Sequence, residues 1–197
     1  MQNDLPIGIT LPMRVKLRDG RAVVLREIQA QDQEGMLAAF HRLSADSRYT
    51  RFMMAMRDPS AGMLEAATHP LPDREFALVA VSTDKRVDRI VAGARYAHAP
   101  GSDTCEFAVT VADDWHGLGL AGRLLQILIA SARERGLRRM EGYVLAMNTP
   151  MRRLARRLGF VDRPCPDDPT LRVMSLSLGD GDALVAGRGS GITTSPL

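Results

Sequence analysis

The most informative stretch for chemistry is the glycine-rich run at residues 115–122, Trp-His-Gly-Leu-Gly-Leu-Ala-Gly. We expect it to join a strand to a helix, because the apolar run 104–111 precedes it and the strongly periodic segment 120–135 follows it. Glycines let the backbone approach a ligand closely, and the first N–H groups of a helix have no partner within that helix. The helix dipole also favours anions there, so a pyrophosphate is the expected ligand of this loop.

Two other interpretations of the loop have to be weighed. Gly117, Gly119 and Gly122 also spell G-x-G-x-x-G, the fingerprint of dinucleotide-binding folds. Such folds place the loop after their first strand and a carboxylate about 20 residues later, at the end of the second strand. Here several strands come first, and Glu141 begins its strand whereas Asn148 follows the strand's end. The context therefore argues against a dinucleotide, while a tight turn without a ligand stays open on the pattern alone.

Glu106 is the acidic residue on the strand that precedes the loop. Because side chains alternate along a strand, Glu106, Ala108 and Thr110 share one face, and their neighbours take the other. A carboxylate among such apolar neighbours is suited to accept a proton as a general base. The alternative is an exposed strand acid or an ion-pair partner, and the residues alone leave the two open.

The elements that must position these residues indicate one mixed α+β domain. Strands are expected at 14–17 and 21–27 around the turn Asp19-Gly20, and then at 76–81, 90–96, 104–111, 140–146 and 171–178. Helices are expected at 31–43, at 44–56, after a cap at Ser60, at 120–135 up to a stop at Gly136, and after an N-cap at Thr149. The strands 76–81, 90–96 and 104–111 should be antiparallel neighbours, because their connections are too short for crossover helices.

The loop and its surroundings resemble the coenzyme A site of the GNAT superfamily of N-acetyltransferases. The run His116-Gly117-Leu118-Gly119-Leu120-Ala121 is similar to that superfamily's pyrophosphate motif, Gln/Arg-x-x-Gly-x-Gly/Ala. Gly119 and Ala121 match the motif, whereas His116 departs from its usual first residue. The resemblance covers about residues 14–177. A closer likeness, carried by stretches such as 40–44, 74–79 and 105–109, is to the acetyltransferase domain of Pat-type protein lysine acetyltransferases.

This resemblance implies a GNAT-like, mainly antiparallel twisted sheet flanked by helices, and transfer of an acetyl group from acetyl-CoA to an amine. It places the catalytic glutamate at Glu106 and lets backbone groups at the end of the strand hold the pantetheine arm. The residues that it assigns to the cofactor are Val109, Thr110, Val111, His116, Gly117, Leu118, Gly119, Leu120, Ala121, Gly122, Arg123, Asn148 and Met151. Many relatives carry a tyrosine general acid where this chain has Ala155. A non-catalytic acyl-CoA-binding regulatory module therefore stays open as an alternative.

The acceptor amine is open between a protein lysine and a small molecule, and the oligomeric state is open as well, a homodimer included. Lysine occurs only at Lys16 and Lys85, so arginine carries nearly all the positive charge. Arginine suits phosphate-bearing ligands because it binds them bidentately. The net charge of +3 does not by itself separate such a ligand from nucleic acid. The acetyltransferase interpretation disfavours nucleic acid as a partner.

The composition predicts a soluble, cytoplasmic protein without a membrane or metal partner. No run approaches the roughly 18 apolar residues that span a bilayer, and residues 1–13 lack the pattern of a signal peptide. Cys105 and Cys165 are too few for a disulfide framework and lack the paired spacing of a zinc site. We expect an N-terminal extension over 1–13, the acetyltransferase domain over 14–178 and a loose C-terminal tail over 179–197.

Overall fold

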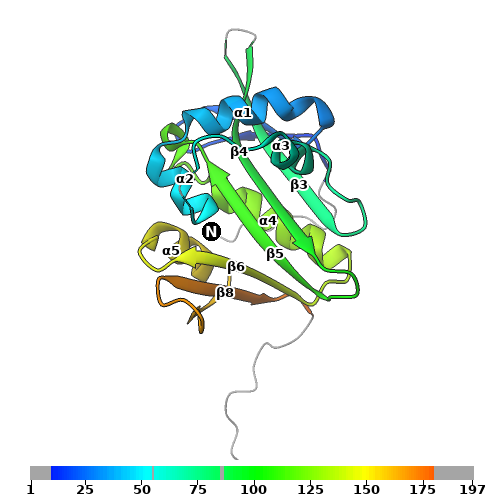
Figure 1. Ribbon diagram of the computed structural model, residues 1–197. Helices are drawn as coiled ribbons and strands as arrows, with labels where there is room; N and C mark the ends of the chain where they lie inside the picture. Colours follow the sequence, from blue (N-terminus) through cyan, green and yellow to red (C-terminus); the bar gives the residue numbers. More distant parts are fainter. Residues whose placement is uncertain (1–9, 55, 85–86, 180–197) are drawn as a thin grey trace, which may run out of the picture.

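The computed structural model describes residues 10–54, 56–84 and 87–179 (Figure 1). The predicted N-terminal extension and C-terminal tail therefore lie almost entirely outside the described residues. Within the described ranges, no helix combines the length and the apolar composition that crossing a membrane requires.

A sheet of eight strands forms the middle of the described part of the chain, in the order β1-β2-β3-β4-β5-β6-β8-β7. The strands are β1 (Met13–Lys16), β2 (Ala22–Glu27), β3 (Glu75–Asp84), β4 (Val87–His98), β5 (Thr104–Val111), β6 (Arg139–Leu145), β7 (Val161–Pro164) and β8 (Leu171–Ser177). Neighbouring strands are antiparallel except β5 and β6, which are parallel. The predicted α+β class and the antiparallel arrangement of β3, β4 and β5 are confirmed.

Helices cover both faces of this sheet (Figure 1). One face carries η1 (Ala30–Asp32), α1 (Gln33–Arg42), α2 (Ala45–Phe52) and α3 (Ala61–Thr68), and the other carries α4 (Leu120–Glu134) and α5 (Thr149–Arg157). The side chains of β5 divide between the two faces as predicted. Phe107 joins the core with α4, whereas Ala108 and Thr110 line the space beneath α1 and α3.

The larger core lies between the sheet and α4. Leu120, Leu124 and Leu128 on one stripe of α4 are at most 1% exposed. Burying each such side chain stabilises the fold by roughly 1.5–3 kcal/mol, so the stripe holds the helix firmly against the sheet. The helix ends before Gly136, whose φ of 74° marks the predicted left-handed stop. The start of α4 is therefore a fixed point next to the end of β5.

Three features of local structure differ from the sequence prediction. The helix predicted at 44–56 ends at Phe52, because Met53 takes a left-handed conformation with a φ of 55°. The edge strand β7 was not predicted, because its four residues are mostly exposed and it ends at Pro164, a residue that sheets tolerate at an edge. The N-cap of α5 is Asn148 and not Thr149, since the Oδ1 atom of Asn148 accepts a hydrogen bond from the N–H of Met151 at 3.1 Å. Both residue types are favourable caps, so the sequence could not choose between them.

Candidate active site

The glycine loop leads from η2 (Asp113–Trp115) into the start of α4, as the sequence predicts. Gly117 and Gly119 have φ angles of 76° and 90°, a region that glycine adopts without strain. Gly119 is the N-cap of α4 and has no side chain to bind the first N–H groups of the helix. These groups and the helix dipole can therefore bind an anion, and the loop fits a phosphate group.

Several of the residues assigned to this loop also have contacts within the protein. His116 places Nε2 at 2.9 Å from the carbonyl oxygen of Val111, so its imidazole binds the end of β5. A Cβ on Gly122 would lie 3.3 Å from Leu154, so this glycine brings α4 close to α5. Leu120 is buried in the core. The exposed and half-exposed residues of the run are His116, Gly117, Leu118, Gly119, Ala121, Gly122 and Arg123.

Arg18, which the sequence analysis did not connect with the loop, lies next to it. Its Nε atom is 3.6 Å from the position that a Cβ on Gly119 would take. The turn that carries Arg18 is held in place by Arg21, whose guanidinium stacks on Trp115 at 3.9 Å and donates to the carbonyl of Asp114 at 2.9 Å. No local pattern connects residues this far apart in the chain. Arg18 adds a positive charge to the anion site.

The strands β5 and β6 lie together only at their start. Their parallel pairing covers Thr104–Glu106 and Arg139–Glu141 and extends no further. Figure 1 shows the two strands parting toward α2 and α5. The ring of Phe107 lies at this point, and a Cβ on Gly142 would be 2.5 Å from it. Only glycine at position 142 leaves room for the ring where the strands begin to separate.

The free edge of β5 presents the backbone of alternate residues. The N–H of Ala112 donates to the carbonyl of Val91 on β4 at 2.8 Å. Since a strand residue points its N–H and C=O to the same side, and successive residues alternate, Thr110 also faces β4. Val109 and Val111 face the opening toward β6, where the Val111 carbonyl already accepts from His116. A ligand between the strands can therefore bind the backbone of Val109 and the N–H of Val111.

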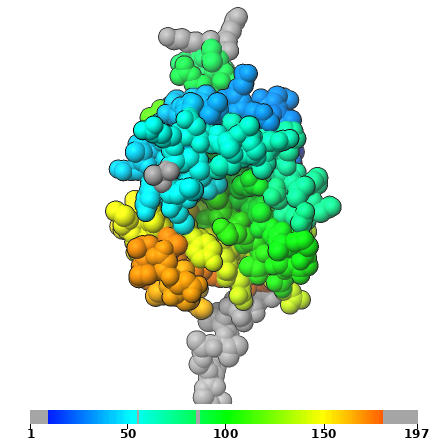
Figure 2. Space-filling model, viewed as in Figure 1, coloured from blue at the N-terminus to red at the C-terminus, as the bar shows by residue number. Residues whose placement is uncertain are grey.

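A groove of about 610 Å³ opens where β5 and β6 part, and Figure 2 shows it as a recess between α2, β5 and β6. Its polar lining comes from Arg51, Arg95, His98, Ser102, Thr104, Glu106, Glu141 and Tyr143. Glu106 is exposed in this groove. The expectation that apolar neighbours surround its carboxylate is therefore wrong, because strand alternation predicts the face of a side chain but not what covers that face. An exposed carboxylate here can accept a proton from a group that enters from solvent.

Asn148 and Met151 lie where β6 passes into α5. The Oδ1 atom of Asn148 caps the helix, and its backbone N–H donates to the carbonyl of Leu145 at 2.9 Å. The side-chain NH2 of Asn148 has no hydrogen-bond partner among the described residues, so it is available to a ligand between the strands. Ala155, at the position where the resemblance to the GNAT superfamily leads one to expect a tyrosine in many members, is completely buried.

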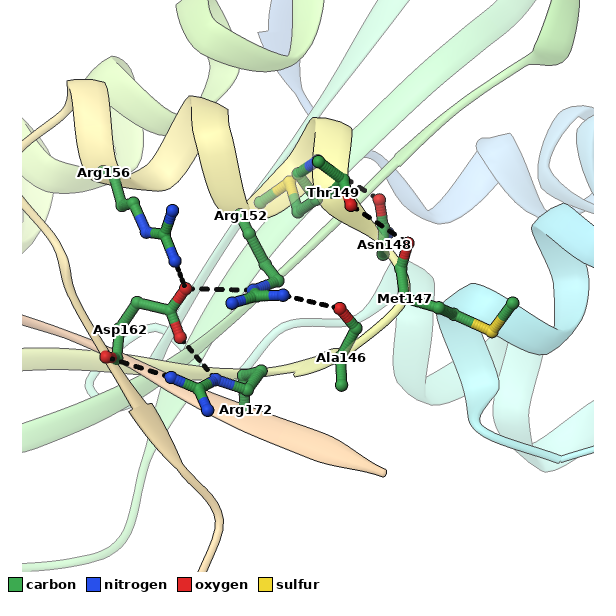
Figure 3. Close-up of polar contacts among 9 residues, drawn as sticks. Ala146, Met147, Asn148, Thr149, Arg152, Arg156, Asp162 and Arg172 are labelled. Atoms are coloured by element: carbon green, nitrogen blue, oxygen red, sulfur yellow. Dashed lines mark hydrogen bonds and ion pairs between the residues drawn. The ribbon is translucent and has the colours of Figure 1, made fainter. Parts of the chain in front are cut away.

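Asp162 on β7 fixes this strand end by binding three arginines, as Figure 3 shows. Its carboxylate accepts from Arg152 at 2.9 Å, Arg156 at 2.6 Å and Arg172 at 2.6 Å, and its side chain is 3% exposed. Arg152 also donates to the carbonyl of Ala146 at 2.7 Å. Arg152 and Arg156 therefore both have a structural partner in Asp162.

Replacing Asp162 by asparagine is expected to lower the free energy of unfolding by about 2–3 kcal/mol at neutral pH, because three guanidinium groups lose a buried counterion. Burial alone raises the pKa of Asp162, and the hydrogen bonds from Arg172, Arg152 and Arg156 outweigh it, so the pKa lies below its usual value. A lowered pKa stabilises the fold above the unfolded value of about 3.9. This stability is lost as the pH falls further, through the folded pKa.

Urea unfolding at a series of pH values measures this effect. The difference between wild type and Asp162→Asn should be constant near neutral pH and shrink below about pH 4. Asp167→Asn is the matched control, since Asp167 is an exposed acid in the next loop. A difference that does not depend on pH would contradict the assigned role of the Asp162 charge.

The sheet thus opens between two parallel strands, next to a helix start that can bind an anion. The model of the acetyltransferase (GNAT) family matches residues 37–160. The chain belongs to this family and is an acetyl-CoA-dependent N-acetyltransferase. Among the described residues, no group of three or more His, Cys, Asp or Glu side chains is placed to hold a metal ion.

Individual relatives agree with this assignment. The chain is 36% identical over 162 residues to an acetyltransferase of Pseudomonas aeruginosa, covering 82% of this chain and 87% of that protein. It is 33% identical over 153 residues to the acetyltransferase Pat of Mycolicibacterium smegmatis, covering 76% of this chain but only 44% of that protein. The crystal structure of the GNAT domain of S. lividans Pat matches with a TM-score of 0.75 and 27% identity, covering 84% of this chain and 96% of that domain. The predicted GNAT-like fold is confirmed.

Proposed function

We propose that this protein acetylates the side-chain amine of protein lysines, with Glu106 as the general base. The observation that carries the proposal is the exposure of Glu106 in a groove of about 610 Å³ that opens to the surface. A lysine side chain is long and thin, so it can reach this carboxylate while its own polypeptide stays at the surface. The sequence resemblance to Pat-type protein lysine acetyltransferases favours the same class of acceptor.

The donor site in this proposal lies between β5 and β6. Acetyl-CoA supplies the acetyl group as an activated thioester. The N–H groups at the start of α4 and the side chain of Arg18 bind the phosphates. The backbone of Val109, the N–H of Val111 and the side-chain amide of Asn148 bind the pantetheine arm. These contacts determine how far the arm extends between β5 and β6. These residues hold the acetyl group at the opening beside Glu106, where an amine can attack its carbonyl carbon. The C–S bond then breaks, and coenzyme A leaves as a thiolate that takes a proton from solvent.

Glu106 is needed because a lysine amine is almost entirely protonated near neutral pH, with a usual pKa of about 10.4. An amine that carries its proton cannot attack a carbonyl carbon, so the proton has to leave first. The carboxylate of Glu106 accepts it on the groove side of β5. The exposed position of Glu106 then allows the proton to pass to solvent.

Labelled acetyl-CoA offered to a cell lysate and to its small-molecule filtrate is expected to label proteins in the presence of the chain. The reason is that a wide groove admits a lysine on a polypeptide. Gel autoradiography and digestion with mass spectrometry identify the acetylated residues, and a sample with Glu106→Gln corrects for spontaneous acetylation. Labelling confined to the filtrate would assign the chain to small-molecule amines and refute the protein acceptor.

A further inference from the structure

Two arginines from different elements line the groove together with Glu106. Arg51 comes from the last turn of α2, and Arg95 comes from β4. The helix α2 is held to the loop after β5, since the carboxylate of Asp113 accepts a hydrogen bond from the N–H of Ser44 at 2.8 Å. The fold therefore places both positive charges beside the proposed base.

The two arginines differ in their partners. Arg95 forms an ion pair with Glu75 at 3.0 Å, and the two side chains are 27% and 19% exposed. Arg51 has no ion pair and no hydrogen bond to any residue in 10–54, 56–84 or 87–179, and its guanidinium contacts the ring of Phe52 at 5.0 Å. Charges that a fold removes from water are normally paired or hydrogen-bonded. Arg51 is thus a positive charge that lies near Glu106 in the groove but makes no direct contact with an anion among the described residues.

The surroundings of Arg51 are unfavourable for its charge. Burial lowers the pKa of the Arg51 guanidinium, and the nearby charge of Arg95 lowers it further, whereas the charge of Glu106 raises it. Arg51 also lines an apolar cavity of about 150 Å³ beneath α1 and α3. Arg51 therefore lies between this cavity and the groove, and its guanidinium is near the charges of Arg95 and Glu106. A bound anion would offset the cost of this arrangement.

Resting on the proposed acetylation of an amine in this groove, we propose that Arg51 binds a carboxylate that the acceptor carries near its amine. The positively charged amine of the acceptor lies against the carboxylate of Glu106. The acceptor's own carboxylate lies against the guanidinium of Arg51. A guanidinium suits this role because it binds a carboxylate through two parallel hydrogen bonds. An acidic residue beside the acceptor lysine and the carboxylate of a free amino acid supply the same group.

Two pairs of acceptor probes test this subsite. The first pair is the capped peptides Gly-Lys-Glu and Gly-Lys-Gln, and the second is free lysine and lysinamide. In at least one pair, kcat/KM is expected to be about tenfold higher for the probe with the carboxylate, the size of one charge-assisted contact. The pair that shows the preference identifies the source of the carboxylate. The preference should weaken at high salt, because the contact is electrostatic.

Variants of Arg51 assign the preference to its side chain. Arg51→Gln is expected to give nearly equal kcat/KM values for the probes with and without the carboxylate. Arg51→Lys keeps the positive charge and should keep part of the preference. The matched control is Arg57→Gln, which removes the same charge from an exposed arginine outside the groove and should leave the preference unchanged. Thermal melting checks that the variants remain folded.

Binding without turnover separates this proposal from the proposed activity. The peptide Gly-norleucine-Glu and its Gln counterpart cannot accept an acetyl group at the side chain, and titration calorimetry measures their Kd. Selective binding of the acidic peptide that Arg51→Gln abolishes, with no acetylation of any lysine probe, would support the subsite and refute the activity. Equal rates and equal Kd values within every pair, or a preference that survives Arg51→Gln, would overturn the subsite.

Discussion

Glu106→Gln is expected to lower kcat for a lysine peptide by about 100-fold at pH 7, within the usual range for loss of a general base. Glutamine keeps the size and the hydrogen-bonding reach of the side chain but cannot accept a proton. The side chain is exposed in the groove, so the substitution leaves the core intact. The Kd for acetyl-CoA should therefore stay unchanged, which calorimetry can establish before the kinetics are compared.

The pH dependence of this loss tests the role of Glu106 as a proton acceptor. The fraction of free lysine amine rises about tenfold per pH unit below its pKa of about 10.4. The difference in kcat between the wild type and Glu106→Gln should therefore shrink as the pH rises, because more of the amine is then unprotonated when it binds. A deficit that stays constant up to high pH would indicate a positioning role instead.

Glu141→Gln is the matched control for Glu106→Gln, since it makes the same chemical change in the same groove. Glu141 lies opposite Glu106 in the β5–β6 pairing, and its carboxylate accepts from the hydroxyl of Ser175 at 3.0 Å. This control should keep most of the wild-type kcat. Full turnover of Glu106→Gln over the whole pH range would show that Glu106 is not the base.

Features determined by local periodicity could be predicted from the sequence. The apolar stripe of α4, the glycine stop at Gly136 and the alternation along β5 each depend on residues within one element. The glycine loop could be located because the residues before it have the pattern of a strand and those after it have the pattern of a helix. Local patterns thus located the proposed phosphate loop and the face of the proposed base.

Contacts between distant segments could not be predicted in the same way. Arg18 reaches Gly119 from the turn between β1 and β2, and Arg51 enters the groove because α2 packs beside β5. Neither arginine differs in sequence pattern from the many others of the chain. The exposure of Glu106 depends on the same packing. Tertiary structure determines which residues surround a site residue. In this protein it brings the charged side chains of the proposed acceptor groove together from different elements.

Gly119→Glu is expected to weaken acetyl-CoA binding by about 100-fold or more, because like charges placed together cost several kcal/mol. The new carboxylate would stand at the free N–H groups of α4, where the phosphates are proposed to bind. Gly119 also has a φ of 90°, so any side chain adds backbone strain at the helix start. Calorimetric titration with acetyl-CoA measures the Kd directly.

The strain and the charge can be separated with a second glycine of the same helix. Gly136 follows α4 at its other end, has a φ of 74° and has no atom within 4 Å of an added Cβ. Gly136→Glu therefore brings similar strain and the same charge far from the phosphate loop, and it should bind acetyl-CoA like the wild type. Gly119→Ala, which carries the strain without the charge, is expected to fall between the two. If Gly119→Glu binds as well as Gly136→Glu, the coenzyme does not use the start of α4, and the proposed donor site is wrong.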